Sequence, residues 1–469
     1  MKDLGRILII GAGPTGIGAA YRLRKLGYTN FKVIDAMAAP GGLASSFVDD
    51  KGFTWDIGGH VQFSHYDYFD DAMNEALGKE GWLHHERESW VWMAERFVPY
   101  PFQNNLRYLP KDLMTKAIRG LVTRPPRTPS PNQDFGSWVL QTFGEGIRDI
   151  FMAPYNYKVW AFPLERLWAG WVGERVAVVD LTRALENIFL ERDDLSWGPN
   201  NTFQFPKHGG TGAVWRALAD QIGKEYFQLN TRVSSIDWKA RKLSTDKGET
   251  LEYDTILSTM PLDVLAKLMT PAVEVAQEAA PKLLRSSSHI IGVGLTGEMP
   301  EKLTKKCWMY FPEDNCPFYR VTVFSNYSPN NVPDPQSGKY WSLMSETSES
   351  EAKAVNRETL VEQTIAGMLN TGLIKSRDQI VSTWHYTAEH GYPTPSLERN
   401  QLLQRIEPAL AKAGVASRGR FGAWKYEVSN QDHSFMQGVE WINSMMLDVP
   451  ETTVRFAETA NSMWGKTRR

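Results

Sequence analysis

A glycine-rich turn near the amino terminus constrains the fold of this chain more than any other feature. The spacing Gly11-x-Gly13-x-x-Gly16 follows an apolar run at 6–10 and precedes an amphipathic stretch at 17–26 and a second apolar run at 31–35. These glycines allow a tight turn, the close approach of a pyrophosphate and close packing of helix on strand. The pattern therefore predicts a βαβ unit whose helix N-terminus binds the phosphates of a dinucleotide.

An acidic residue and further glycine clusters extend this prediction. Asp35 ends the second apolar run, where a carboxylate can accept hydrogen bonds from ribose hydroxyls. The cluster PGGLAS at 40–45 follows it, as in the amine-oxidase and protoporphyrinogen-oxidase superfamily of flavoproteins, and this resemblance favours FAD over NAD. Paired glycines also occur at 58–59 and 209–210, where the missing Cβ would let the backbone approach a flavin. An ordinary tight turn remains the alternative interpretation of Gly41 and Gly42.

The remainder of the chain divides by its periodicity. Residues 106–195 have helical periodicity, interrupted by a Pro- and Thr-rich segment at 123–131 that we expect to be an exposed loop. The segments at 232–237, 251–253 and 255–258 are predicted strands that rejoin the first sheet. Strands at 289–295, 308–311, 318–324 and 340–345 are predicted to form a second sheet, and 420–439 a strand, a turn and a helix.

These segments predict an α/β fold with a Rossmann-like FAD-binding domain, a helical domain and a second, mainly antiparallel sheet that forms a substrate domain. The expected FAD-binding domain comprises residues 1–86, 200–262 and 418–469. The helical domain is expected at 107–199, and the sheet-containing substrate domain at 87–106 and 263–417.

Composition excludes several classes of protein. The 52 Lys and Arg against 54 Asp and Glu give a net charge of -2, so no global field attracts nucleic acid or an anionic membrane. Cys307 and Cys316 are too few for a disulfide framework, which favours a reducing, cytoplasmic location. No apolar run approaches about 18 residues, so no membrane span is expected. No metal-ligand motif is present, and no metal is predicted.

Several long motifs are more specific than the glycine clusters. They are GGHVQFSHYDYFD from Gly58, VPYPFQNN from Val98, FMAPYNYKVWAFP from Phe151, GERV from Gly173, FPEDNCPFYRVTVFSNYS from Phe311, HGYPTP from His390 and GRFGAWKYEVSNQDHSF from Gly419. Together they resemble the eukaryotic (fungal) type of UDP-galactopyranose mutase, over nearly the whole chain. This resemblance implies a flavoenzyme with a UDP-sugar substrate.

The resemblance also implies a substrate site. A diphosphate carries two negative charges, and arginines bind such groups well. Arg175 and Arg320 are therefore expected to clamp it, while isolated structural ion pairs are the alternative. The full set of expected substrate residues is Tyr100, Phe102, Gln103, Phe151, Asn156, Trp160, Arg175, Trp308, Tyr310, Arg320, Tyr392, Arg420, Tyr426 and Asn430, of which the aromatic residues near Tyr100 and Trp160 would hold the uracil. Core packing is the alternative for Phe151.

Cofactor and catalytic residues follow from the same resemblance. The expected cofactor residues are Gly11, Gly13, Pro14, Thr15, Gly16, Asp35, Gly42, Leu43, Ala44, Ser45, Gly58, Gly59, His60, Val233, Asn430, Gln431 and Ser434. The expected catalytic residues are Arg175, Arg320, His60 and Asn200. His60 would make a polar contact near the flavin, and a structural histidine is the alternative.

The implied reaction interconverts UDP-galactopyranose and UDP-galactofuranose. Reduced FAD would attack the anomeric carbon through N5 with no net redox change, and NADPH or NADH would be the reductant. Three alternatives remain: a mutase that acts on a related nucleotide sugar, an amine-oxidase-type oxidoreductase, and a nucleotide-sugar sensor. The sequence does not choose among sugars, and it leaves the oligomeric state open.

Overall fold

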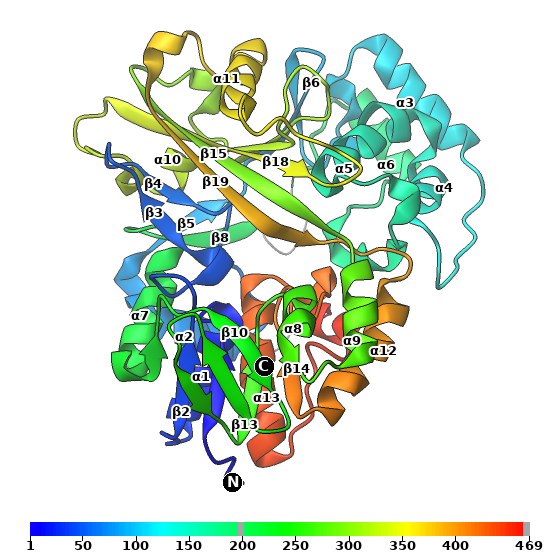
Figure 1. The fold of residues 1–469 in the computed structure, drawn as a ribbon. Coiled ribbons are helices and arrows are strands. Elements are labelled where there is room, and N and C mark those ends of the chain that lie inside the picture. Colours follow the sequence, from blue (N-terminus) through cyan, green and yellow to red (C-terminus); the bar gives the residue numbers. More distant parts are fainter. Residues whose placement is uncertain (196–200, 463–469) are drawn as a thin grey trace.

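The computed structural model describes residues 1–195 and 201–462. A parallel sheet and its covering helices form one half of the molecule, and a long antiparallel sheet with a helical region forms the other (Figure 1). The chain crosses between the halves several times, so each half is assembled from segments that are distant in sequence.

The parallel sheet begins with the predicted βαβ unit. Its strand order is β20 (Val415–Ser417), β13 (Thr255–Ser258), β1 (Ile7–Ile10), β2 (Phe31–Ile34) and β9 (Phe227–Gln228). All four residues of β1 are buried, as expected of a central parallel strand. Helix α1 (Pro14–Lys25) follows the glycine turn and packs on α13 (Gln431–Leu447) so closely that a Cβ on Gly18 would lie 2.2 Å from a carbonyl oxygen of α13. Helices α2 (Asp67–Leu77) and α7 (Gly212–Ile222) complete this layer.

Three strand predictions in this half were wrong. Residues 232–237 and 251–253 do not rejoin the parallel sheet. They fall in a separate sheet with the order β12 (Thr250–Glu252), β11 (Lys242–Thr245), β10 (Val233–Asp237) and β14 (Met269–Thr270), because β10 pairs antiparallel with β11 across a tight turn. The predicted strand beginning at 420 is a turn, and the strand lies earlier, at β20. Three helices pack near this sheet: α8 (Leu262–Leu268), α9 (Glu274–Ala279) and α12 (Arg399–Lys412).

The second sheet contains all four predicted strands. Within the described ranges its order is β19 (Ile380–Pro393), β15 (Arg285–Thr296), β18 (Tyr340–Glu349), β17 (Arg320–Val323), β16 (Trp308–Tyr310), β6 (Ser89–Met93) and β7 (Arg96–Pro99). Every neighbouring pair is antiparallel except β16 with β6. Helices α10 (Phe324–Tyr327) and α11 (Leu360–Asn370) adjoin it. The predicted α/β fold with a second, mainly antiparallel sheet is therefore confirmed.

The segment at 106–195 is helical, as predicted. It contains α3 (Lys111–Thr123), α4 (Phe135–Ile147), a π-helical turn (Arg148–Met152), α5 (Ala153–Trp160), a short 3-10 turn (Gly173–Arg175) and α6 (Leu181–Phe189). Residues 124–130 form the expected loop. None of the helices in the described part of the chain is both long and apolar enough to cross a membrane.

The remaining elements connect the halves. The hairpin of β3 (Ser46–Val48) and β4 (Thr54–Asp56) and the antiparallel pair of β5 (Trp82–Glu86) and β8 (Thr202–Pro206) lie between the two large sheets (Figure 1). The short helix α14 (Ala457–Asn461) contacts the 3-10 turn that carries Arg175.

Candidate functional site

The two amino-terminal glycine clusters fold against each other. Gly11 has φ of +104°, which favours glycine, and its N–H donates to Ile34 at 2.7 Å. The Gly41 N–H donates to the Ala12 carbonyl at 2.8 Å, which brings the second cluster onto the first. A Cβ on Gly13 would have only Gly41 and Gly42 within 4 Å, at 3.8 Å or more. The turn therefore leaves an open approach to its backbone at Gly13.

The glycine clusters at 11–16 and 40–45 together form a surface that we call the cradle, and Asp35 lies at its edge. Its carboxylate accepts hydrogen bonds from the backbone N–H groups of Ala12 at 2.6 Å and Met37 at 2.7 Å. Burial raises the pKa of Asp35, and the two N–H donors oppose that rise. Each oxygen accepts one of these bonds, and a carboxylate can accept about four, so it retains capacity for ribose hydroxyls.

The other expected cofactor residues lie on loops and helix ends nearby. Pro14 and Thr15 open α1, while Gly42, Leu43 and Ala44 form a 3-10 turn that Ser45 follows. Asn430 is the N-cap of α13, and Gln431 and Ser434 lie in its first turn. Val233 begins β10, outside the parallel sheet.

The described residues of this cradle fit a dinucleotide with a flavin. Among them, the buried hydroxyl of Ser45 and the buried Nδ1 atom of His60 have no hydrogen-bond partner. Buried polar atoms in proteins are nearly always hydrogen-bonded, so these atoms point to a polar ligand. The open backbone at Gly13 and the free N–H groups at the α1 N-terminus suit its pyrophosphate.

Two glycine variants should separate the cradle's fold from its binding role. Gly13→Ala should fold, because Gly13 has φ of -77° and the added Cβ meets no close contact, but it should bind FAD at least about tenfold more weakly because the methyl group obstructs the pyrophosphate. Gly16→Ala should fail to fold, since its Cβ would lie 1.8 Å from the Gly11 carbonyl oxygen. Circular dichroism and FAD titration would measure both. Normal FAD affinity in Gly13→Ala would contradict the proposed cradle.

Arg320 is held in place by a carboxylate that the sequence analysis did not identify. Arg320 Nε and Nη2 each donate to Glu346 at 2.8 Å, and Glu346 also accepts from the Tyr319 hydroxyl at 2.7 Å and from the Gly59 N–H at 3.0 Å. Burial opposes ionisation of Glu346, but Arg320 and the hydrogen bonds outweigh it and lower its pKa. Glu346 thus joins Arg320 to the Gly58–Gly59–His60 segment. In the sequence, Glu346 is visible only as an acidic residue directly after the strand predicted at 340–345.

Arg175 and Arg420, the other arginines of the site, are not paired with a carboxylate of the described residues. Arg175 NH2 donates to the Glu427 carbonyl oxygen at 2.7 Å, and Arg420 donates to the Gly391 carbonyl at 3.0 Å and to Ser429 at 2.9 Å. Neither arginine forms an ion pair with any carboxylate of the described residues. Burial lowers the pKa of Arg420, which means that its charge is poorly solvated. Both side chains are half-buried, and the buried Nη1 atom of Arg175 has no hydrogen-bond partner, so these arginines favour an anionic ligand.

Aromatic side chains join these arginines. Arg420 lies 5.0 Å from the ring of Tyr392 and 5.7 Å from that of Tyr426, and Arg175 lies 5.7 Å from Tyr426. The Trp160 ring is 5.7 Å from Tyr392 and 4.8 Å from Tyr426. The structure therefore brings these predicted substrate residues together, and it adds Trp171, 4.9 Å from Trp160, which the sequence analysis missed.

A second aromatic group lies beside the first. The Tyr310 ring is 5.3 Å from Tyr100 and 5.5 Å from Tyr155, which the sequence analysis also missed. Tyr155 stacks on Phe151 at 5.4 Å, and Phe151 on Phe102 at 4.5 Å. Phe102 and Phe151 are buried in the hydrophobic core, at 0% and 3% exposure, so core packing accounts for much of their environment.

The remaining predicted residues are placed as follows. Asn156 and Trp160 share a face of α5, and Asn156 donates to the Met152 carbonyl at 2.7 Å. Gln103 donates to the Ala177 carbonyl, close in sequence to Arg175. Trp308 lies on β16, with its indole 5.9 Å from the Arg320 guanidinium. Asn200 lies outside the described residues.

His60 has charged neighbours in this site. Its electrostatic neighbours are Glu346, Arg320 and Arg420, and burial lowers its pKa to about 4. His60 is therefore neutral at neutral pH, which suits a polar contact and not the role of a charged group.

Comparisons with known proteins agree with this geometry. A family model described as flavin containing amine oxidoreductase matches residues 14–413. A crystal structure of reduced UDP-galactopyranose mutase is 47% identical, with a TM-score of 0.94, and the match covers 99% of this chain and 98% of that one. A putative protoporphyrinogen oxidase from Exiguobacterium sp. has a TM-score of 0.69 at 16% identity, covering 96% of this chain and 100% of that one. A fatty acid isomerase from P. acnes has a TM-score of 0.66 at 14% identity, covering 95% and 100%. The last two show a shared fold alone. On the family model and the 47% identical structure, this chain belongs to the flavin-containing amine oxidoreductases and, within them, to the UDP-galactopyranose mutase family.

Proposed function

We propose that the protein interconverts UDP-galactopyranose and UDP-galactofuranose without net redox change, as an isomerase. The single observation that carries this proposal is the convergence of Arg175 and Arg420, which lack ion pairs among the described residues, on Tyr392, Tyr426 and Trp160. Two half-buried cations and phenolic hydroxyls beside an aromatic wall suit a nucleoside diphosphate. An oxidase for amines would need no such anion site.

Each group of site residues would then have a separate role in the reaction. Arg175, Arg320 and Arg420 bind the diphosphate and stabilise it when it leaves the anomeric carbon. Tyr392 and Tyr426 donate hydrogen bonds to it, and the aromatic residues near Tyr100 and Trp160 orient the uracil. FAD held in reduced form would supply an electron-rich N5 to attack the anomeric carbon, and NADPH or NADH would be its reductant.

Product analysis tests this function. The dithionite-reduced holoprotein would be incubated with UDP-galactose, UDP-N-acetylgalactosamine and UDP-arabinose, and the products would be separated by anion-exchange chromatography. We expect a furanose product from at least UDP-galactose, with no oxidised sugar. An oxidised product with stoichiometric hydrogen peroxide would indicate an oxidoreductase, and binding without turnover would indicate a sensor.

A further inference from the structure

The segment that carries His60 has little regular structure of its own. Residues 57–66 connect β4 to α2 and are held by contacts with distant segments. The Gly59 N–H donates to Glu346 at 3.0 Å, and Gln62 exchanges main-chain hydrogen bonds with Gln204 at 3.0 and 2.9 Å. Its last part is held by α13. We call residues 57–66 the His60 loop.

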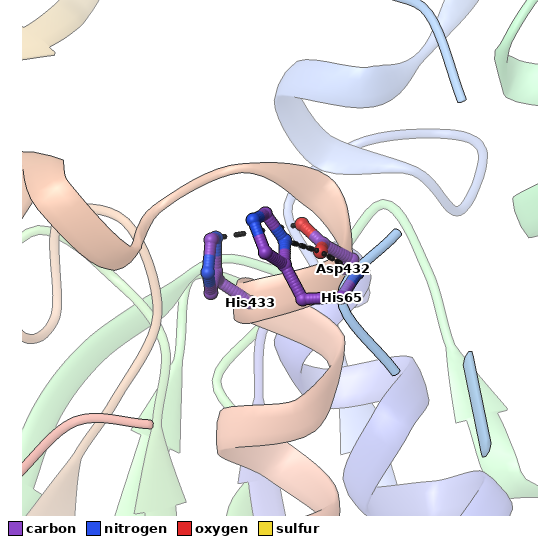
Figure 2. Close-up of side chains that lie close together, drawn as sticks. All are labelled: His65, Asp432 and His433. Carbon is purple, nitrogen blue, oxygen red and sulfur yellow. Dashed lines mark hydrogen bonds and ion pairs between the residues drawn. The ribbon is translucent and has the colours of Figure 1, made fainter. Parts of the chain in front are cut away.

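Three buried side chains meet where the His60 loop contacts α13. Figure 2 shows His65, Asp432 and His433 side by side at the first turn of that helix. Asp432 Oδ2 accepts from the His65 backbone N–H at 3.0 Å and lies 2.7 Å from His65 Nδ1. His433 Nδ1 lies 3.4 Å from Asp432 Oδ1, and the two imidazole centroids are 4.6 Å apart. All three side chains are 0% to 1% exposed.

Within this arrangement, His65 and Asp432 form a hydrogen-bonded pair. Two ligand atoms bound tetrahedrally to one zinc ion lie about 3.3 Å apart, given bonds of about 2.0–2.1 Å. The 2.7 Å between His65 Nδ1 and Asp432 Oδ2 is instead the length of a charge-assisted hydrogen bond.

The charges of the cluster favour the same interpretation. Burial lowers the pKa of His433 to about 3, so His433 is neutral at neutral pH. Burial also opposes ionisation of Asp432, but the neighbouring imidazoles and the two donors of His65 lower its pKa, and it is ionised. The groups that act electrostatically on Asp432 and His433 include each other, His65 and Arg175. Because a buried carboxylate is costly without donors, Asp432 is strongly tied to His65.

We propose that Asp432 is a positioning residue that fixes the His60 loop to the first turn of α13. The adjacent residue supports this, because Gln62 of the same loop donates to Gln431 Oε1 at 3.0 Å. Two successive residues of α13 therefore hold one loop, and the loop and the predicted cofactor helix act as one rigid unit. The inference rests on the proposed FAD site.

Removing the carboxylate's charge should release the loop. In Asp432→Asn and His65→Ala we expect FAD to bind about tenfold or more weakly, because a charge-assisted hydrogen bond is lost. We also expect the ratio of FAD dissociation constants in the oxidised and reduced states to change, because the loop places His60 beside the cofactor. His65→Asn should restore affinity largely, since its side-chain amide can still donate to Asp432.

A matched control separates positioning from general instability. Glu451→Gln removes another buried carboxylate charge, one paired with Arg418 outside the His60 loop, and should destabilise the fold without changing the redox ratio of FAD affinities. FAD affinities and ratios within twofold of wild type in folded Asp432→Asn, or a failure of His65→Asn to rescue His65→Ala, would overturn the proposal. So would stoichiometric metal in the holoprotein by elemental analysis. These readouts need no UDP-sugar, so absent mutase activity would count against the proposed function alone.

Discussion

Arg320→Ala is expected to lower kcat/KM by about 2–4 kcal/mol of transition-state stabilisation, or about 30- to 900-fold. In the proposed reaction the guanidinium binds the departing diphosphate, where negative charge develops. It also neutralises Glu346, so its removal leaves a buried carboxylate without its cation. Such a loss costs about 3–5 kcal/mol of folding free energy. We therefore expect both slower turnover and a lower midpoint of thermal unfolding.

Two further variants separate these effects. Arg175→Ala should lose a similar factor in kcat/KM but little stability, because Arg175 NH2 contacts a carbonyl oxygen and no carboxylate of the described residues. Arg418→Ala breaks the buried pair with Glu451 and should lose stability with nearly normal kcat/KM. Steady-state kinetics and calorimetry measure both quantities. A fully active Arg175→Ala protein would contradict the diphosphate clamp.

Turnover is expected to stop in fully oxidised protein and to proceed after reduction. The proposed reaction needs an electron-rich N5, whereas oxidised flavin lacks the electron pair that attacks the anomeric carbon. We expect the difference to reach the detection limit of the assay, which would make it the largest effect in this protein. No stoichiometric consumption of reductant should accompany turnover.

The measurement compares anaerobic, dithionite-reduced protein with ferricyanide-oxidised protein on UDP-galactose. The flavin spectrum recorded before and after turnover confirms the redox state. Reoxidation in air should abolish activity, and a second reduction should restore it. Equal rates in the two states would exclude a mechanism through reduced N5, while the anion site could still bind UDP.

The sequence predicted best the features that depend on neighbours in the chain. The glycine turn, α1 and β2 form one continuous segment, and their spacing alone requires the βαβ unit that the structure contains. Four strands of the second sheet, β15, β16, β17 and β18, were also found, because each has its own β-branched and aromatic pattern, whereas β6, β7 and β19 were not predicted. Predictions of sheet membership were less reliable, since β10 and β12 have ordinary strand sequences and only their pairing decides which sheet they join.

Within the site, sequence indicated chemical types and tertiary structure decided which groups meet. Arginines and tyrosines suited to a diphosphate were visible as motifs, but nothing local distinguished Arg320, which is paired, from Arg420, which is not. Glu346 reaches Gly59 across 287 residues of sequence, and Asp432 reaches His65 across 367. A motif records the local chain, whereas burial and charge pairing arise only when distant segments pack and exclude water. The sequence by itself therefore determined the dinucleotide fold and indicated a diphosphate ligand, and only the tertiary structure decided which carboxylates hold Arg320 and the His60 loop in place.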